Sequence, residues 1–152
     1  MRILLVAVGR CRSGPERELY RHYARRLTWP LTLKEIEADG RLPPQRQKER
    51  EGEELLAAIP RDAGVIALDE RGETLDSLGL AKRLGQWRDR GMGEIACLIG
   101  GTEGLDEPVK RRADLLLSLG RVTWPHFLVR GLLAEQLYRA QQILAGHPYH
   151  RA

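Results

Sequence analysis

Short apolar runs alternate with amphipathic stretches along this chain of 152 residues, and that alternation constrains the fold more than any other feature. The apolar runs predict strands over Arg2–Val8, Leu31–Glu37, Val65–Asp69, Glu94–Ile99 and Leu116–Val122. The stretches between them predict helices over Pro15–Leu27, Gln45–Ile59, Ser77–Arg90 and Glu107–Leu115, and a long final helix from about His126 to Ala145. Apolar strands separated by helices predict an α/β fold, a mostly parallel sheet sandwiched by helices.

The length is that of one domain, because two independent cores would each be marginal in a chain of this size. We therefore expect a single domain over residues 1–152. The apolar run from Ile3 to Val8 is too short for a membrane span or a secretory signal, which predicts a cytosolic protein without a membrane partner. Cys11 and Cys97 lie far apart, so neither a disulfide framework nor a zinc site is indicated.

Positive charge is concentrated in the first third of the chain. Residues 1–50 hold 12 Lys and Arg against 6 Asp and Glu, a balance of +6 within a total of +4. Arg17, Arg21 and Arg25 recur at four-residue intervals and would form a stripe along a helix that could neutralise phosphates. A solvated helix face explains the same pattern, and for a basic run alone it is the commoner explanation.

The final helix is apolar around more of its circumference than one sheet contact requires. Two arrangements explain this. Two copies of the chain could cross at this helix as a homodimer, or the helix could be sunk between the sheet and a neighbouring helix.

A glycine loop, Gly100-Gly101-Thr102-Glu103-Gly104, follows a buried strand and precedes a helix. Such a loop lets a flat ligand approach the main chain at the end of a parallel strand, where open α/β folds bind ligands. It lacks the Lys-Ser/Thr of a Walker A motif, and Glu103 would repel a polyphosphate. Taken alone, it is also explained as a simple strand-capping turn.

Histidine, tyrosine and arginine gather near the C-terminus, and Tyr149, His150 and Arg151 follow a proline where a terminus would ordinarily fray. His147 and His150 lack nearby acidic or thiolate partners, so we expect no metal site. His126 is interpreted as a helix-start residue packing behind Pro125.

Several motifs recur in a single order along the chain, and with them the sequence resembles the RlmH family from end to end. The motifs are Ala7-Val8-Gly9, Lys48-Glu49-x-Glu51-Gly52-Glu53, Leu68-Asp69, Gly100-Gly101-x-Glu103-Gly104, Ser118-Leu119, Thr123-x-Pro125-His126, Val129-Arg130, Glu135-Gln136-x-Tyr138-Arg139-Ala140 and Tyr149-His150. These are SPOUT-class methyltransferases that modify N3 of a pseudouridine in large-subunit ribosomal RNA. One departure is Thr102, where many relatives carry proline.

The resemblance implies a C-terminal trefoil knot that forms the site for S-adenosyl-L-methionine. By motif position, the cofactor site would comprise Leu68, Gly100, Leu119, Gly120, Arg121, Val122, Thr123 and Trp124. It also implies action on the helix 69 loop of 23S ribosomal RNA within the assembled 70S ribosome. The homodimer is expected from the apolar surface of the final helix.

The candidate catalytic residues are His150, Tyr149, Arg151 and Arg130. A histidine is the natural proton acceptor near neutral pH, so His150 is the candidate base, with Tyr149 and Arg151 positioning RNA. A guanidinium could stabilise charge on the carbonyl oxygens as the N3 proton leaves. A general base is not strictly required.

Two other classes remain open from the sequence. A non-catalytic RNA-binding module would explain the basic first third but would leave the glycine loop without a ligand. A dinucleotide-dependent oxidoreductase would need an acidic ribose-binding residue about 20 positions after the loop, where Leu119-Gly120-Arg121 stands instead.

Overall fold

The computed structural model, which describes residues 1–151, contains one five-stranded sheet whose paired strands all run parallel. The strand order is β2-β1-β4-β3-β5. Strands and helices alternate along the chain: β1 (Arg2–Val8), α1 (Pro15–Ala24), β2 (Leu31–Ile36), α2 (Pro44–Ala58), β3 (Gly64–Thr74), α3 (Ser77–Asp89), β4 (Glu94–Ile99), α4 (Glu107–Arg112), β5 (Leu115–Ser118) and α5 (His126–Leu144). The predicted α/β sandwich is confirmed.

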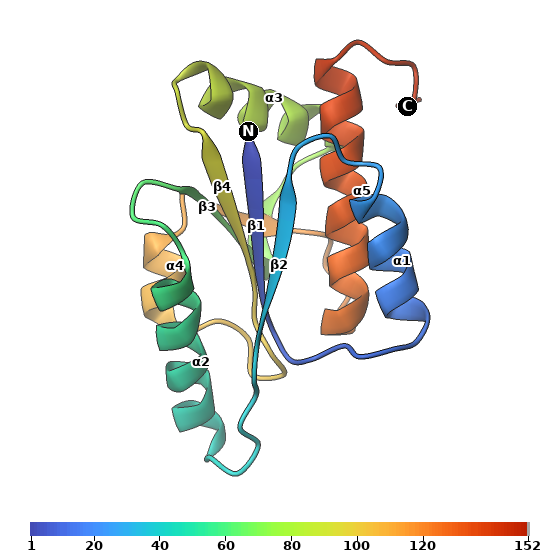
Figure 1. Ribbon diagram of the computed structural model, residues 1–152. Helices are drawn as coiled ribbons and strands as arrows, with labels where there is room; N and C mark the ends of the chain where they lie inside the picture. The colour runs from blue at the N-terminus through green and yellow to red at the C-terminus, as the bar shows by residue number, and fades with distance from the viewer. Residues whose placement is uncertain (152) are drawn as a thin grey trace.

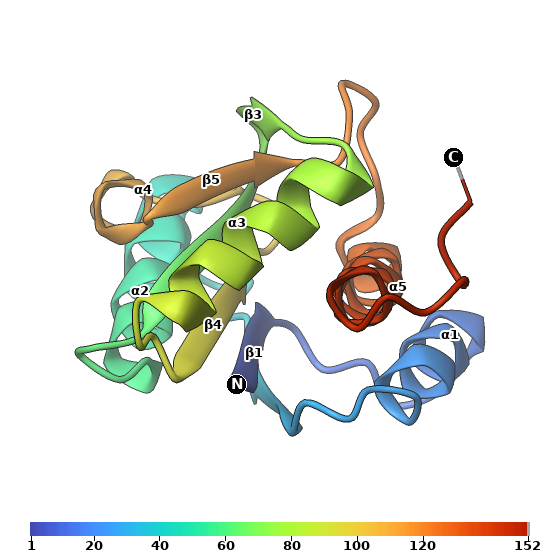
Figure 2. The same ribbon diagram turned by 90° about the horizontal axis from the view of Figure 1, so that it is seen from above.

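Helices cover both faces of the sheet (Figures 1 and 2). On one face α1, α3 and α5 bury residues such as Leu84 and Leu133 against Ile66. On the other, α2 and α4 bury Leu55 and Val109. Because parallel strands covered on both sides exclude water from both faces, the central strands β1 and β4 are apolar at nearly every position, which explains why the sequence pattern located them. Strand β2, at an edge of the sheet, alternates apolar and polar residues instead.

Strand β3 is longer than predicted and irregular. Leu117 of β5 pairs with Leu68 and again with Glu73, so residues 69–72 bulge out of the ladder. Gly72 makes the bulge possible, since a Cβ there would lie 2.6 Å from the carbonyl oxygen of Leu116. The excursion carries Asp69 and its neighbours to the carboxyl end of the sheet.

Two predicted ends near β5 are wrong. Helix α4 stops at Arg112 because Ala113 is already extended, with ψ 133°. The amide of Asp114 then donates to the carbonyl oxygen of Val65 at 2.8 Å, and Leu115 pairs with β3. Strand β5 ends at Ser118 because Gly120 takes φ +109°, which turns the chain out of the sheet.

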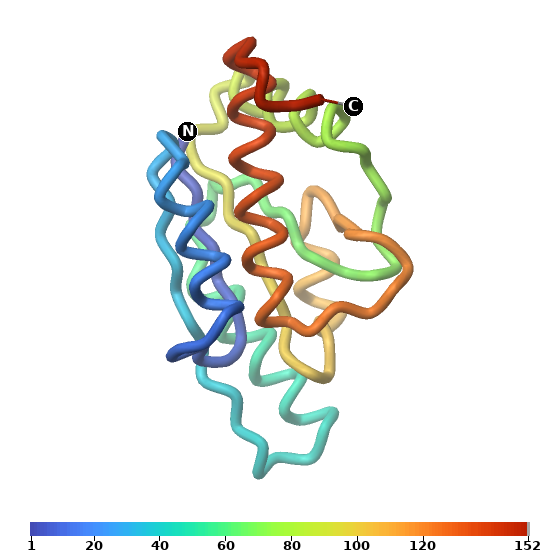
Figure 3. The backbone as a smooth tube through the Cα atoms, turned by 90° about the vertical axis from the view of Figure 1, so that its right-hand side faces the viewer, coloured from blue at the N-terminus to red at the C-terminus, as the bar shows by residue number. Residues whose placement is uncertain are grey.

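Helix α5 lies between α1 and α3 and packs against the sheet. Figure 3 shows α1, in blue, running beside α5, in red. No residue of His126–Leu144 is fully exposed. Most of its apolar surface is therefore covered within one chain, but Leu128 and Leu132 stay half-buried and belong to neither core cluster, so the homodimer stays a prediction. The trefoil knot stays a prediction.

Candidate active site

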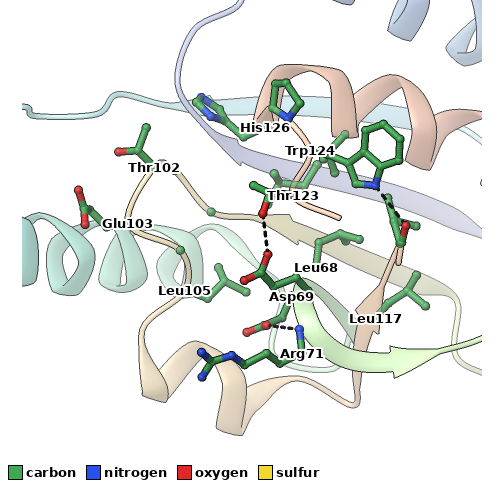
Figure 4. Close-up of a pocket in the computed structure, with 18 of the residues that line it drawn as sticks. Leu68, Asp69, Arg71, Thr102, Glu103, Leu105, Leu117, Thr123, Trp124 and His126 are labelled. Atoms are coloured by element: carbon green, nitrogen blue, oxygen red, sulfur yellow. Dashed lines mark hydrogen bonds between the residues drawn. The ribbon is translucent and has the colours of Figure 1, made fainter. Parts of the chain in front are cut away.

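A cavity of about 650 Å³ opens at the carboxyl ends of β3, β4 and β5. The bulge of β3, the glycine loop after β4 and the segment between β5 and α5 surround it, as Figure 4 shows. The residues predicted for the cofactor converge here: Leu68, Gly100, Leu119, Gly120, Val122, Thr123 and Trp124 all line the cavity. Arg121 is exposed and does not line it.

The glycine loop forms a tight turn closed on itself. The amide of Gly104 donates to the carbonyl oxygen of Gly101 at 3.1 Å, and Gly104 takes φ +79°. Gly100 has no room for a side chain, because a Cβ would lie 2.9 Å from the carbonyl oxygen of Gly104. The turn therefore presents main chain to the cavity.

The segment after β5 is tied to the bulge of β3. The hydroxyl of Ser118 contacts the carbonyl oxygens of Glu70 and Gly120, both at 3.0 Å, and the hydroxyl of Thr123 donates to the Glu70 carboxylate at 3.3 Å. The indole of Trp124 donates to the carbonyl oxygen of Leu119 at 3.2 Å. These bonds hold an arch of main chain over one side of the cavity.

The arch ends in an apolar rim. Val122 is 60% exposed and Trp124 is 40% exposed. Among the described residues, the other large apolar side chain that is exposed is Leu78 of α3, at 51%. Large apolar side chains held in the open beside a cavity are typical of a surface that a ligand or partner covers.

Charged side chains that the sequence analysis missed also line the cavity. Asp69 lies 3.2 Å from the ammonium group of Lys110 and accepts a hydrogen bond from the amide of Arg71 at 2.8 Å. Burial would raise the pKa of Asp69, but these contacts outweigh it and lower the pKa. The available signal was the polar interruption Glu70-Arg71-Gly72 directly after an apolar strand.

His126 stands at the first position of α5 and forms part of the cavity wall. Its ring packs on Phe127, with the centroids 4.5 Å apart. Burial, and then the positive charge of Arg130, lower its pKa. The interpretation of His126 as a packing residue is thus incomplete, because it also faces the cavity.

Arg130, a candidate catalytic residue, does not reach this cavity. Its side chain is 2% exposed and donates to Glu35 and to the carbonyl oxygen of Gly9, both at 2.6 Å. It lies over the ring of Phe127 at 4.9 Å. In one protomer Arg130 therefore fastens α5 to the ends of β1 and β2.

The C-terminal tail folds back on α5 instead of lying at the cavity. The hydroxyl of Tyr149 donates to Glu135 at 3.1 Å, and its ring meets that of Tyr138 edge to face at 4.7 Å. The guanidinium of Arg139 lies 3.1 Å from Nδ1 of His150. Arg151 is exposed. The tail residues come together with one another but not with the cofactor residues of their own chain.

Among residues 1–151, no helix is long and apolar enough to cross a membrane. Within the same residues, no three His, Cys, Asp or Glu side chains gather as a metal site.

Comparison with known proteins places this geometry in a class. A family model described as "Predicted SPOUT methyltransferase" matches residues 1–150. A solved structure, of a probable methylase family protein from Haemophilus influenzae Rd KW20, shares the fold with a TM-score of 0.57 at 13% identity, over 99% of this chain and 70% of that chain. The chain therefore belongs to the SPOUT methyltransferases, a class whose methyl donor is S-adenosylmethionine.

Two curated relatives carry the name ribosomal RNA large subunit methyltransferase H. One, from Rhodospirillum centenum, is 60% identical over the full length of both chains. The other, from Paramagnetospirillum magneticum, is 55% identical over 99% of each. The chain belongs to this family of ribosomal RNA methyltransferases.

Proposed function

We propose that this protein, one SPOUT domain over residues 1–152, is a cytoplasmic enzyme that methylates N3 of a pseudouridine in the helix 69 loop of 23S ribosomal RNA, on the assembled 70S ribosome. The observation that carries the proposal is the cavity at the carboxyl ends of β3–β5, where residues from three separate segments meet. Its full-length relatives bear the name of a ribosomal RNA methyltransferase.

The cavity fits S-adenosylmethionine in size and chemistry. Its volume lies within the range of about 300–1,000 Å³ that is usual for cofactor sites. Leu68, Leu117 and Leu119 offer apolar contact for a nucleobase, and the glycine turn offers main-chain groups. The lining carries three acidic and three basic side chains, so it lacks the excess of positive charge that a polyphosphate needs; they are Asp69, Glu70, Glu103, Lys48, Arg71 and Lys110.

When bound, S-adenosylmethionine supplies a methyl group that its sulfonium already activates. The chain must then place the imide nitrogen in line and let its proton leave. Val122 and Trp124, exposed at the rim, would pack against the incoming base and exclude water from the reacting atoms.

The tail argues for a second copy of the chain. His126 at the start of α5 lines the cavity, whereas the tail follows the other end of the helix, as Figure 1 shows. A helix of 19 residues is about 28 Å long. Tyr149, His150 and Arg151 cannot contact RNA at their own cofactor site over that length. A homodimer that brings the tail of one protomer to the cavity of the other completes the site.

The contact between Arg139 and His150 defines what the imidazole can do there. A guanidinium only donates, so Nδ1 of His150 accepts and a neutral ring carries its proton on Nε2. While Nδ1 of His150 accepts from Arg139, Nε2 is the ring nitrogen left to donate to another partner. We therefore propose that His150 donates to a carbonyl oxygen of the base, with the N3 proton passing to water, and that Tyr149 and Arg151 position the RNA.

Mixed dimers test the arrangement. A chain lacking residues 149–152 and a chain carrying Gly100→Val should each be inactive on ribosomes with labelled S-adenosylmethionine. Mixing them should restore activity, because one interface then combines an intact cavity with an intact tail. A monomeric mass in sedimentation with full activity would overturn the homodimer, and failure of the mixture to recover would overturn the shared site.

A further inference from the structure

A second cavity, of about 580 Å³, lies between α1, the carboxyl end of β2 and the start of α5. No residue lines both cavities. The proposed transfer of a methyl group uses none of its side chains, so the second cavity needs an account of its own.

Arginine dominates the charge of this cavity. Arg12, Arg17, Arg21 and Arg130 line it, against the carboxylates of Glu16 and Glu35. Glu35 is already paired with Arg130. Within residues 1–151, Arg12 and Arg17 form no salt bridge, and Arg21 has only a loose contact with Glu18, at 3.9 Å. The cavity therefore carries an excess of positive charge that suits an anion.

The basic stripe predicted for α1 is divided by this cavity. Arg17 and Arg21 line it, whereas Arg25 follows the end of the helix and does not. Arg17 and Arg21 can therefore bind a ligand in the cavity, whereas Arg25 shares only their four-residue spacing.

The floor of the cavity is apolar and aromatic. Tyr20, Leu33 and Phe127 form it. Burial raises the pKa of Tyr20 to about 12, so its phenol stays neutral. Arg130 adds a buried Nε–H that has no hydrogen-bond partner among the described residues. A free phosphate ion would use the arginines alone, but a nucleotide would use the arginines and the floor together.

The second cavity adjoins the first. His126 lines one and Phe127 lines the other, so the first turn of α5 divides them. Both rings pack over Gly9, where a Cβ would lie 3.0 Å from Phe127 and 3.4 Å from His126. A strand of RNA whose target base faces the methyl donor would pass over this turn.

We propose that the second cavity holds a nucleotide of the ribosomal RNA strand beside the target base, with its phosphate on Arg12, Arg17 and Arg21 and its base against Tyr20 and Phe127. Arginine–phosphate contact and base–aromatic contact are the two ordinary means of holding single-stranded RNA. The proposal rests on the proposed function, since it names a subsite for the same substrate.

The test compares Arg17→Gln/Arg21→Gln with a matched control, Arg25→Gln/Arg90→Gln, which removes the same charge from exposed positions outside the cavity. The cavity variant should raise KM for ribosomes about tenfold and lower the salt dependence of KM by about one to two charges, with kcat and the Kd for S-adenosylmethionine unchanged. The control should match wild type. Equal KM values and salt slopes in the two variants would overturn the subsite.

Amide NMR separates a nucleotide from a simple anion. Uridine 3′-monophosphate should shift the amide signals of Cys11 and Arg12, and inorganic phosphate at the same concentration should shift them much less, because it contacts the arginines but not the aromatic side chains. Equal shifts with both would overturn the nucleotide assignment in favour of a small-anion site. The titration requires no methyl transfer, so it tests nucleotide binding independently of activity. Inactivity on ribosomes would contradict the proposed function, and only the titration would decide whether the cavity binds a nucleotide.

Discussion

The guanidinium of Arg130 donates a hydrogen bond of 2.6 Å to the carboxylate of Glu35, across 95 positions of sequence. The same guanidinium donates to the carbonyl oxygen of Gly9 at the end of β1. The amide of Cys11 donates to Glu35 at 2.8 Å. This cluster holds the start of α5 against the ends of β1 and β2, at the point where the two cavities meet.

Removing Arg130 should therefore act on stability. Arg130→Gln should lower the free energy of unfolding by about 3 kcal/mol, because it leaves Glu35 without its charged partner and removes the donor from the carbonyl oxygens of Val8 and Gly9. Urea denaturation measures the loss. Arg26→Gln, at an exposed position, is the control. A decrease in the free energy of unfolding of less than about 0.5 kcal/mol would contradict a structural role for Arg130.

Glu35 makes part of this stability depend on pH. Burial would raise its pKa, but the bonds from Cys11 and Arg130 outweigh burial and lower it. Its stabilisation is therefore present above the ordinary glutamate pKa of about 4.3 and is lost as pH falls through the lowered value. Glu35→Gln should destabilise at pH 7 and much less in acid, whereas a loss that is constant with pH would argue against the ion pair.

Glu51 predicts the opposite dependence. It is 3% exposed, and its Oε1 atom has no hydrogen-bond partner among the described residues. Burial raises the pKa of Glu51 most, and the negative charges of Glu103 and Glu54 raise it further. The hydrogen bond from Gln47 opposes this rise but does not cancel it. Since the folded state binds the proton more tightly, stability falls as pH rises above about 4.3.

Glu51→Gln should remove that fall and raise stability at pH 8 by about 1–2 kcal/mol, because a neutral amide replaces a buried charge. Thermal unfolding between pH 5 and 8 measures the slope. Glu53→Gln, exposed on the same helix, should leave the slope as in wild type. A steeper slope in the Glu51 variant would refute the raised pKa.

Gly100→Val should weaken binding of S-adenosylmethionine more than tenfold, since the side chain would collide with the turn that shapes the cavity. It should also cost about 1–3 kcal/mol of stability, because the collision is with main chain of the protein itself. Calorimetry and thermal unfolding measure the two effects. The control is Gly93→Val, just before β4, where a Cβ would have no neighbour within 4 Å. Unchanged cofactor affinity in the Gly100 variant would show that the loop is not part of the cofactor site.

The elements of this fold could be predicted because their apolar periodicity is local. The bulge of β3 could not, because Gly72 is required by its approach to Leu116, a contact that only the folded sheet creates. The structural role of Arg130 could not be predicted for a similar reason, since its partner Glu35 is remote in sequence, and its catalytic role stays a prediction. Arg121 was placed in the cavity by its neighbours in sequence, but the arch turns its side chain outward.

Deleting residues 149–152 should lower stability only slightly, by about 1 kcal/mol, because the lost contacts lie on the half-buried surface of α5. Cofactor affinity should match wild type, since the cavity lies at the other end of the helix. Methyl transfer to ribosomes should fall at least a hundredfold. A deletion variant that unfolds would make the tail structural.

His150→Ala distinguishes positioning from proton transfer. If His150 donates a hydrogen bond, kcat should fall by a factor that stays constant between pH 6 and 9. If it acts as a base, the loss of about 10²–10⁴-fold should shrink as pH rises and the imide ionises without help. The contact with Arg139 predicts the first result, and Arg139→Gln should share it.

The most direct test of the account is mass spectrometry of nucleosides from 23S ribosomal RNA, after incubating unmodified 70S ribosomes with the protein and isotopically labelled S-adenosylmethionine. The account predicts one labelled methyl group per ribosome, on N3 of a pseudouridine in the helix 69 loop, and none on free 23S RNA. Labelling at another nucleotide or another atom, or no labelling by protein that binds the cofactor, would contradict it.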